Sequence, residues 1–220
     1  MLIAFSLLGG AFSLLFNGLN LEKNKQEIRE GTSSFFFAIL GGYGNVISDF
    51  IWLRAYIYWD RQDLDNCIAN MDLALAINPH SKSLWTYAYT TLAYDSPHWI
   101  AEERGLQNMK QIGRIQGKKA LKYIERALEY FPEDRSFLMD KANIYIHKLD
   151  DIKSAIAIYK DICDKDESLV FPMRNYANLL YRDGQIKASK KVLQKIITQL
   201  PPNTPTHKEI SQELEALELK

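Results

Sequence analysis

The chain has 220 residues, of which 47% are apolar and 25% are charged, so it is long enough to bury a core and too rich in aromatic side chains to be disordered. Its 27 Lys and Arg residues are balanced by 27 Asp and Glu residues. A chain without net charge has no positive field that would gather phosphates, which argues against nucleic acid and for protein partners.

The N-terminal stretch, residues 1–19, contains no charged side chain. As a helix rising about 1.5 Å per residue it would reach roughly 28 Å, close to the hydrocarbon thickness of a bilayer. We therefore expect residues 1–20 to form a hydrophobic helix that anchors the chain in a membrane. A cleaved signal and an ordinary buried helix stay open as alternatives, since serines, glycines and Asn17 dilute the run and no basic residue precedes it.

Residues 21–47 are predicted to be a linker with an apolar leader. Its charged part, residues 22–30, mixes basic and acidic side chains and leaves the membrane orientation weakly determined. The apolar part, residues 31–44, is too short to span a bilayer. It either covers the exposed core of the following repeat or acts as a wedge at the membrane surface, with these aromatic rings at headgroup depth: Phe35, Phe36, Phe37 and Tyr43.

Helical periodicity begins near residue 48. A first helix is marked by Ile51, Ala55 and Tyr58, and a turn follows at Gln62. The apolar face of a second helix is formed by Cys67, Met71 and Ala74. Pro79 should end this helix, because proline lacks the amide hydrogen and clashes with the preceding turn.

Two later segments, residues 136–169 and 170–203, read as successive copies of one 34-residue helix–turn–helix unit. The repeated positions hold Met139, Ala142, Asn143, Ile146, Ala155, Tyr159, Ile162 and Glu167, and then Met173, Tyr176, Ala177, Leu180, Ser189, Leu193, Ile196 and Pro201. Small residues are needed where the two helices of a pair cross closely. This pattern resembles the tetratricopeptide repeat.

The resemblance implies an all-α fold, a right-handed α-solenoid of about four helix–turn–helix repeats over residues 48–204. The units are 48–81, 82–135, 136–169 and 170–203. The second is split, because the signals of its second helix (Ala120, Ile124, Ala127 and Pro132) arrive late. We expect an insert at 96–116 that opens at Ser96-Pro97 and continues as an extended helix, which either serves binding or packs along the solenoid. Residues 205–220 should form a capping helix with Ile210, Leu214 and Leu217 on one stripe.

Catalytic and metal-binding patterns are absent from the sequence. The four histidines are scattered, and no His-Glu-x-x-His or Cys-x-x-Cys supplies metal-ligand spacing. Cys67 and Cys163 both fall on second helices of repeats two units apart, which argues against a disulfide. We expect no enzyme activity, no cofactor, no metal and no small-molecule substrate. An enzyme using His98 with residues 102–104 of the insert is a remote third possibility.

A partner-binding groove is implied by the resemblance, since first helices line the inner face of such solenoids. The positions that would line it are Asp49, Trp52, Tyr56 and Trp59 in the first unit, Ser83, Thr86, Thr90 and Ala93 in the second, Phe137, Asp140, Ile144 and His147 in the third, and Phe171, Arg174, Asn178 and Tyr181 in the fourth. Trp and Tyr concentrate at protein interfaces. Trp52 and Trp59 could alternatively pack against the insert or the leader.

Some members of the family clamp a C-terminal carboxylate with Lys and Asn, but the corresponding positions here hold Trp52 and Tyr56, which disfavours that mode. Residues 41–60 and 84–95 also resemble bacterial membrane-anchored proteins of this repeat class without known activity. The resulting hypothesis is a non-catalytic scaffold that holds a partner polypeptide in its groove. It would be tethered to a bacterial inner membrane with its repeats on the periplasmic side. The alternative is a structural subunit of an oligomeric envelope complex, with its groove filled by its own N-terminal segment.

Overall fold

The computed structural model describes residues 43–104 and 108–218. The predicted anchor at 1–20 and nearly all of the predicted leader at 21–47 lie outside the described residues. Within the described ranges the chain is helical and contains no strand. None of the helices described is long and apolar enough to cross a membrane.

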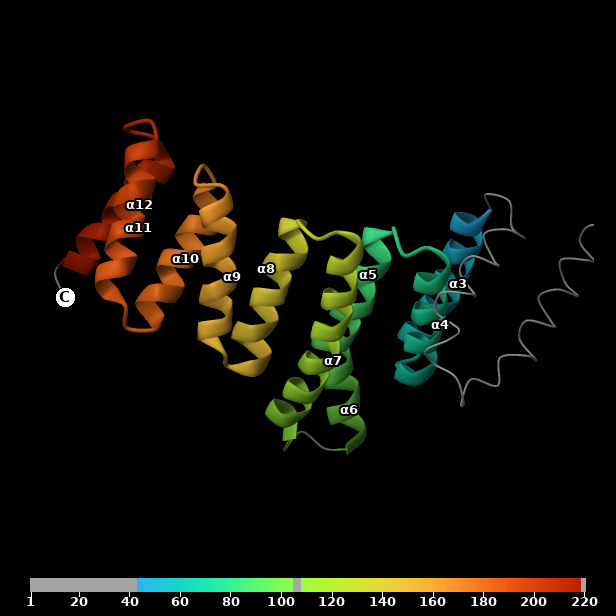
Figure 1. Ribbon diagram of the computed structural model, residues 1–220. Helices are drawn as coiled ribbons and strands as arrows, with labels where there is room; N and C mark the ends of the chain where they lie inside the picture. Colours follow the sequence, from blue (N-terminus) through green and yellow to red (C-terminus); the bar gives the residue numbers. More distant parts are fainter. Residues whose placement is uncertain (1–42, 105–107, 219–220) are drawn as a thin grey trace, which may run out of the picture.

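The helices follow one another as antiparallel pairs that stack along the molecule (Figure 1). The first pair is α3 (Gly44–Asp60) and α4 (Leu64–Ile77), and the last two pairs are α8 (Arg135–Ile144) with α9 (Ile152–Lys165) and α10 (Val170–Arg182) with α11 (Ile186–Gln199). Helix α12 (Pro205–Glu218) packs on α11 and ends the row. This arrangement confirms an all-helical fold built from helix pairs.

The second pair is longer than the others. Its first part, α5 (Lys82–Thr90), runs through a π-helical turn (Thr91–Asp95) into α6 (Ser96–Arg104) without a break in helical backbone. The chain returns through the 22-residue α7 (Met109–Tyr130). The predicted insert is therefore an extension of both helices of the pair, which reaches beyond the neighbouring pairs (Figure 1).

Ser96-Pro97 does not start a new, separate helix as the sequence predicted. The Ser96 amide donates to the carbonyl of Thr91, five residues back, and the Ser96 hydroxyl donates to the carbonyl of Leu92 at 2.9 Å. Because Pro97 has no N–H, it cannot continue the regular ladder. The wider π-helical spacing takes up that irregularity, so the helix continues through the proline.

The turns inside the pairs are set by single residues. Asp63 caps α4 by accepting from the Asn66 amide, and Asp151 caps α9 by accepting from the Ser154 amide at 3.0 Å. Gly184, between α10 and α11, has a φ of 80°, which glycine adopts without a Cβ clash. These caps and turns fix where each second helix begins.

The core consists of three clusters of buried side chains, and small residues occupy the helix crossings. Ala55, Ala142 and Ala177 on first helices are fully buried. Ser189 packs against α10, where its hydroxyl donates to the Ala177 carbonyl at 2.8 Å. The predicted stripe of α12 covers the last cluster with Ile210, Leu214 and Leu217. Small residues at the crossings and a capping helix are thus both present.

The two cysteines are free thiols and belong to different core clusters, Cys67 to the first and Cys163 to the last. Burial raises the pKa of each thiol to about 11, with smaller contributions from nearby Asp carboxylates. Both are therefore protonated and shielded at neutral pH.

Candidate partner-binding surface

Five aromatic side chains form a continuous row over the first two repeats. We call these residues the aromatic row: Tyr87, Trp52, Tyr56, Trp59 and Trp99. Successive ring centroids are 5.1, 6.1, 5.5 and 6.1 Å apart, and the Tyr56 and Trp59 rings stack while the Trp59 and Trp99 rings meet edge to face. Each spacing falls in the range where aromatic pairs attract each other.

Three helices build the row. Trp52, Tyr56 and Trp59 repeat at the spacing of one face of α3, while Tyr87 comes from α5 and Trp99 from α6. The Trp59 indole N–H donates to the Asp95 carboxylate at 2.8 Å, which ties α3 to the π-helical turn. The aromatic row is thus held by a polar contact as well as by ring packing.

The aromatic row is open to solvent. The Tyr56 and Tyr87 residues are 50% and 46% exposed, and Trp52, Trp59 and Trp99 are half-buried. Exposed neighbouring aromatic rings offer large rigid contact area at a small entropic cost, which is the usual composition of a binding surface.

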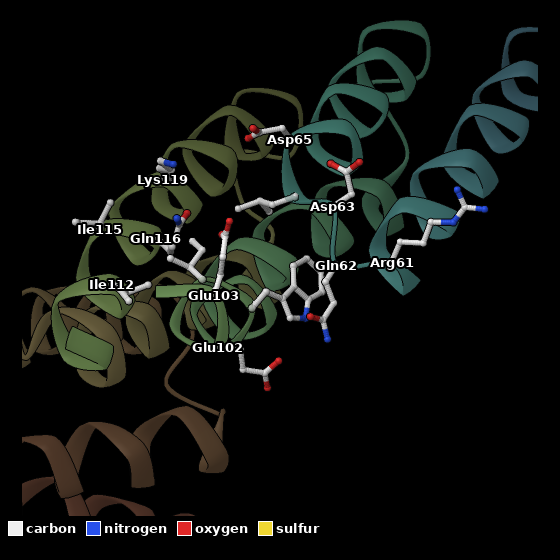
Figure 2. Close-up of a pocket in the computed structure, with 13 residues that line it drawn as sticks. Arg61, Gln62, Asp63, Asp65, Glu102, Glu103, Ile112, Ile115, Gln116 and Lys119 are labelled. Carbon is white, nitrogen blue, oxygen red and sulfur yellow. The ribbon is translucent and has the colours of Figure 1, made fainter. Parts of the chain in front are cut away.

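A pocket of about 710 Å³ adjoins the aromatic row and shares Trp99 with it. It lies between the α3–α4 turn, α6 and α7 (Figure 2). Its charged lining side chains are Asp63, Asp65, Glu102, Glu103, Arg61 and Lys119. The pocket also contains one buried amide, Gln116, which is 4% exposed.

The predicted groove positions of the first two units are only partly brought together. Trp52, Tyr56 and Trp59 join the aromatic row, and Asp49 is exposed on the same helix. Thr86 and Thr90 are half-buried, and their hydroxyls donate to carbonyls of the same helix. Of the remaining two predicted positions, Ser83 is exposed, whereas Ala93 is fully buried and so cannot line a groove.

In the last two units, the side chains at several predicted groove positions make contacts within the chain. Phe137 is 2% exposed and packs between Tyr89 and Phe131, so it belongs to the core. Asp140 accepts the hydroxyl hydrogen of Tyr89. Arg174 donates to the Glu209 and Glu213 carboxylates of α12.

The other predicted positions of these units are dispersed. His147 and Asn178 are exposed, Phe171 is 65% exposed, Tyr181 packs half-buried on the last core cluster, and Ile144 is fully buried. Among the residues described, no group of His, Cys, Asp or Glu is placed to hold a metal ion.

Tyr87 and Trp99 were missed by the sequence reasoning. The groove register selects Thr86 and Thr90, and Tyr87 lies about 100° around the helix from Thr86. Trp99 lies in the insert, for which the repeat pattern provides no register. The one available signal was compositional, since all four tryptophans of the chain fall on α3, α5 and α6, close to Tyr residues.

Comparison with known families shows a match of the "Tetratricopeptide repeat" family model to residues 48–81. Residues 48–81 are thus similar to a tetratricopeptide repeat. The matched repeat holds α3 and α4, and with them the three α3 residues of the aromatic row. No curated protein matches the chain.

Solved structures with tetratricopeptide repeats are also similar. YrrB, described as having an unusual peptide-binding site, shares 13% identity over 77% of this chain and 86% of its own, with a TM-score of 0.43. A Parabacteroides merdae repeat protein shares 17% over 79% and 74%, with a TM-score of 0.38. The TPR2AB domain of yeast Sti1, described as a complex with pHSP90, shares 16% identity over 83% of this chain and 74% of its own, with a TM-score of 0.39.

Proposed function

We propose that this chain is a non-catalytic scaffold that holds a partner polypeptide against the aromatic row. The observation that carries the proposal is the row itself, since Tyr56 and Tyr87 are half exposed although each sits in ring contact with a neighbour. A protein that only needed these rings for its own core would bury them. Tetratricopeptide repeats in general serve protein interaction, which fits this use of the surface.

The test compares two neighbouring residues of α3 that have almost equal exposure. Tyr56 belongs to the aromatic row, whereas Ile57, 49% exposed, lies about 100° further round the helix. A photo-crosslinking amino acid is placed at either position in the full chain, and crosslinked products are collected from native cells. We expect position 56 to give a discrete crosslinked protein that position 57 does not give. Absence of a product at position 56 would contradict the scaffold.

Membrane tethering is part of the proposal. It rests on the uncharged stretch at 1–19, which would hold the repeats next to membrane-bound partners and raise their effective concentration. We place the chain at a bacterial inner membrane with the repeats on the periplasmic side. The full chain should stay with the membrane fraction through a high-salt wash, and release by salt alone would overturn the tether.

A second candidate function is favoured by another surface of α3. Five apolar residues at helical spacing are 48% to 70% exposed and form what we call the α3 stripe: Tyr43, Val46, Phe50, Leu53 and Ile57. Such a stripe suits a structural subunit whose first helix is covered in an oligomer or by its own N-terminal segment. Phe50→Glu in the full chain tests this. A lower assembly mass or lower stability supports a covered stripe, and an unchanged protein supports the scaffold alone.

A further inference from the structure

The α3 stripe occupies positions that the later repeats cover. Phe50 and Ile57 are 66% and 49% exposed. One 34-residue period later the equivalent residues are Leu84 and Thr91, which are 4% and 3% exposed. The equivalents in the last two units are half-buried or buried: Leu138 and Tyr145, then Pro172 and Leu179. The stripe is therefore a face that this repeat uses for packing.

The second helix of the preceding unit covers this face in the later repeats. Leu84 belongs to the core cluster that contains Met71 of α4. Leu179 belongs to the cluster that contains Tyr159 of α9. Across the same boundary, the Asn175 side chain donates to the Tyr159 hydroxyl at 3.3 Å. For α3, the equivalent covering helix would come from the residues that precede it in the chain.

The residues before α3 carry the signals of such a second helix. Each second helix has a small residue or a cysteine, then a larger apolar residue four positions on, and another apolar residue three further on. The four sets are Cys67, Met71 and Ala74; Ala120, Ile124 and Ala127; Ala155, Tyr159 and Ile162; and Ser189, Leu193 and Ile196. One period before the first set, these positions hold Ser33, Phe37 and Leu40.

The first helix of this preceding unit is not matched. The positions that hold Ile51 and Tyr58 in the first repeat correspond to Asn17 and Asn24 one period earlier. Polar amides there would leave the unit without an apolar face on its first helix. The register thus predicts half a repeat, which consists of its second helix alone.

The turn into α3 is compatible with this arrangement. Helix α3 begins at Gly44, whereas the register of α5, which begins at Lys82, would place its start at residue 48. Gly41 and Gly42 would end the preceding helix early as well, because glycine commonly follows a helix end. The described chain starts at Tyr43, the first residue of the stripe, so a segment joined there folds back by closing a very short loop.

We propose that residues 32–40 form the second helix of an incomplete repeat and cover the α3 stripe. In this register Phe37 faces Leu53, as Tyr159 faces Asn175 in the last two units. Both members of the pair are apolar, which suits burial from water. The inference rests on the second proposed function, a covered stripe, and commits it to one occupant. The aromatic row stays open for a partner.

The test places a pair of cysteines in the full chain. Phe37→Cys with Leu53→Cys should form a disulfide within one chain, because helices in contact bring facing Cβ atoms into bonding range. The matched control is Phe36→Cys with Leu53→Cys, since residue 36 lies about 100° around the helix from residue 37. The native thiols are buried and react slowly.

Dilute protein is oxidised with glutathione disulfide, and unreduced peptides are followed by mass spectrometry. We expect the bond between positions 37 and 53 to form at least about tenfold faster than the bond between positions 36 and 53. Equal rates for the two pairs, or no bond in either, would overturn the inference.

A further variant separates the inference from the proposed function on which it rests. If Leu53→Cys alone gives a disulfide-linked dimer, a second copy covers the stripe, which overturns the inference and leaves the covered stripe standing. If Phe50→Glu also leaves assembly mass and stability unchanged, the second proposed function fails together with the inference. The scaffold is judged separately, by crosslinking at position 56.

Discussion

The two halves of the molecule, α3 to α7 and α8 to α12, use the same helix pairs in different ways. In the C-terminal half, Arg174 is bound to α12 and Phe137 is buried. In the N-terminal half, Tyr56 and Tyr87 remain half exposed. The comparison teaches that the repeat register determines where a residue lies on its first helix, whereas contacts with neighbouring helices determine whether its side chain is accessible to a partner.

The largest expected effect concerns the cysteines, of which each half contains one. Burial raises the pKa of Cys67 and of Cys163 to about 11. At pH 8 the thiolate fraction should therefore be at least about a hundredfold below that of a free cysteine. Labelling with a maleimide, followed by mass spectrometry, should be slow at both sites in the native protein and fast in denaturant. Labelling of either thiol at the rate of a free cysteine would contradict its burial.

The joint between the halves depends on a glycine. A Cβ atom on Gly117 of α7 would lie 2.7 Å from Lys148 Cβ, closer than the two atoms can approach. Gly117→Ala should lower the free energy of unfolding by about 1–2 kcal/mol, because the clash outweighs the helix propensity of alanine. Gly113→Ala on the same helix meets nothing within 4 Å and serves as the control. Thermal unfolding compares the two, and equal melting temperatures would contradict the close contact.

The capped C-terminal half should depend on Arg174. Arg174→Met leaves the half-buried Glu213 without its partner and should cost about 1–2 kcal/mol. Hydrogen exchange should accelerate in α12 and stay unchanged in α3 to α6. Arg182→Met, an exposed arginine of the same helix, is the control. Unaltered exchange in α12 would show that the apolar stripe alone holds it.

The smallest effect is a pH dependence at the start of α9. Hydrogen bonds from the Ser154 side chain and amide lower the pKa of Asp151. Because the folded-state pKa lies below the unfolded value, the cap stabilises the protein above about pH 4 and loses its effect as pH falls further. Asp151→Ala should cost about 1 kcal/mol at pH 7 and little near pH 2. Asp151→Asn keeps the cap without the titration, so thermal unfolding of this control should show a smaller pH dependence.

Much of the fold could be predicted from the sequence, because small residues, caps and Pro79 are local signals. Ala142, Ala177 and Ser189 lie at helix crossings as the repeat pattern indicates. The site was harder to predict. The contact of Arg174 with Glu213 joins helices far apart in sequence, and Trp99 meets Trp59 only because two helices extend beyond the repeat.

The π-helical turn at Thr91–Asp95 determines which single-residue deletions would remove Trp99 from the aromatic row. A turn of this kind contains one residue more than the α-helical turn it replaces. Because the wider turn takes up that residue, the helix on either side keeps its phase, and deleting one residue there, such as Ala93, would restore an α-helical turn and leave Trp99 facing Trp59. A deletion in α6 between the turn and Trp99 would instead rotate Trp99 by about 100° and remove it from Trp59. A single codon lost in α6 would thus be enough to dismantle the end of the aromatic row beside the pocket, whereas one lost in the π-helical turn would be absorbed.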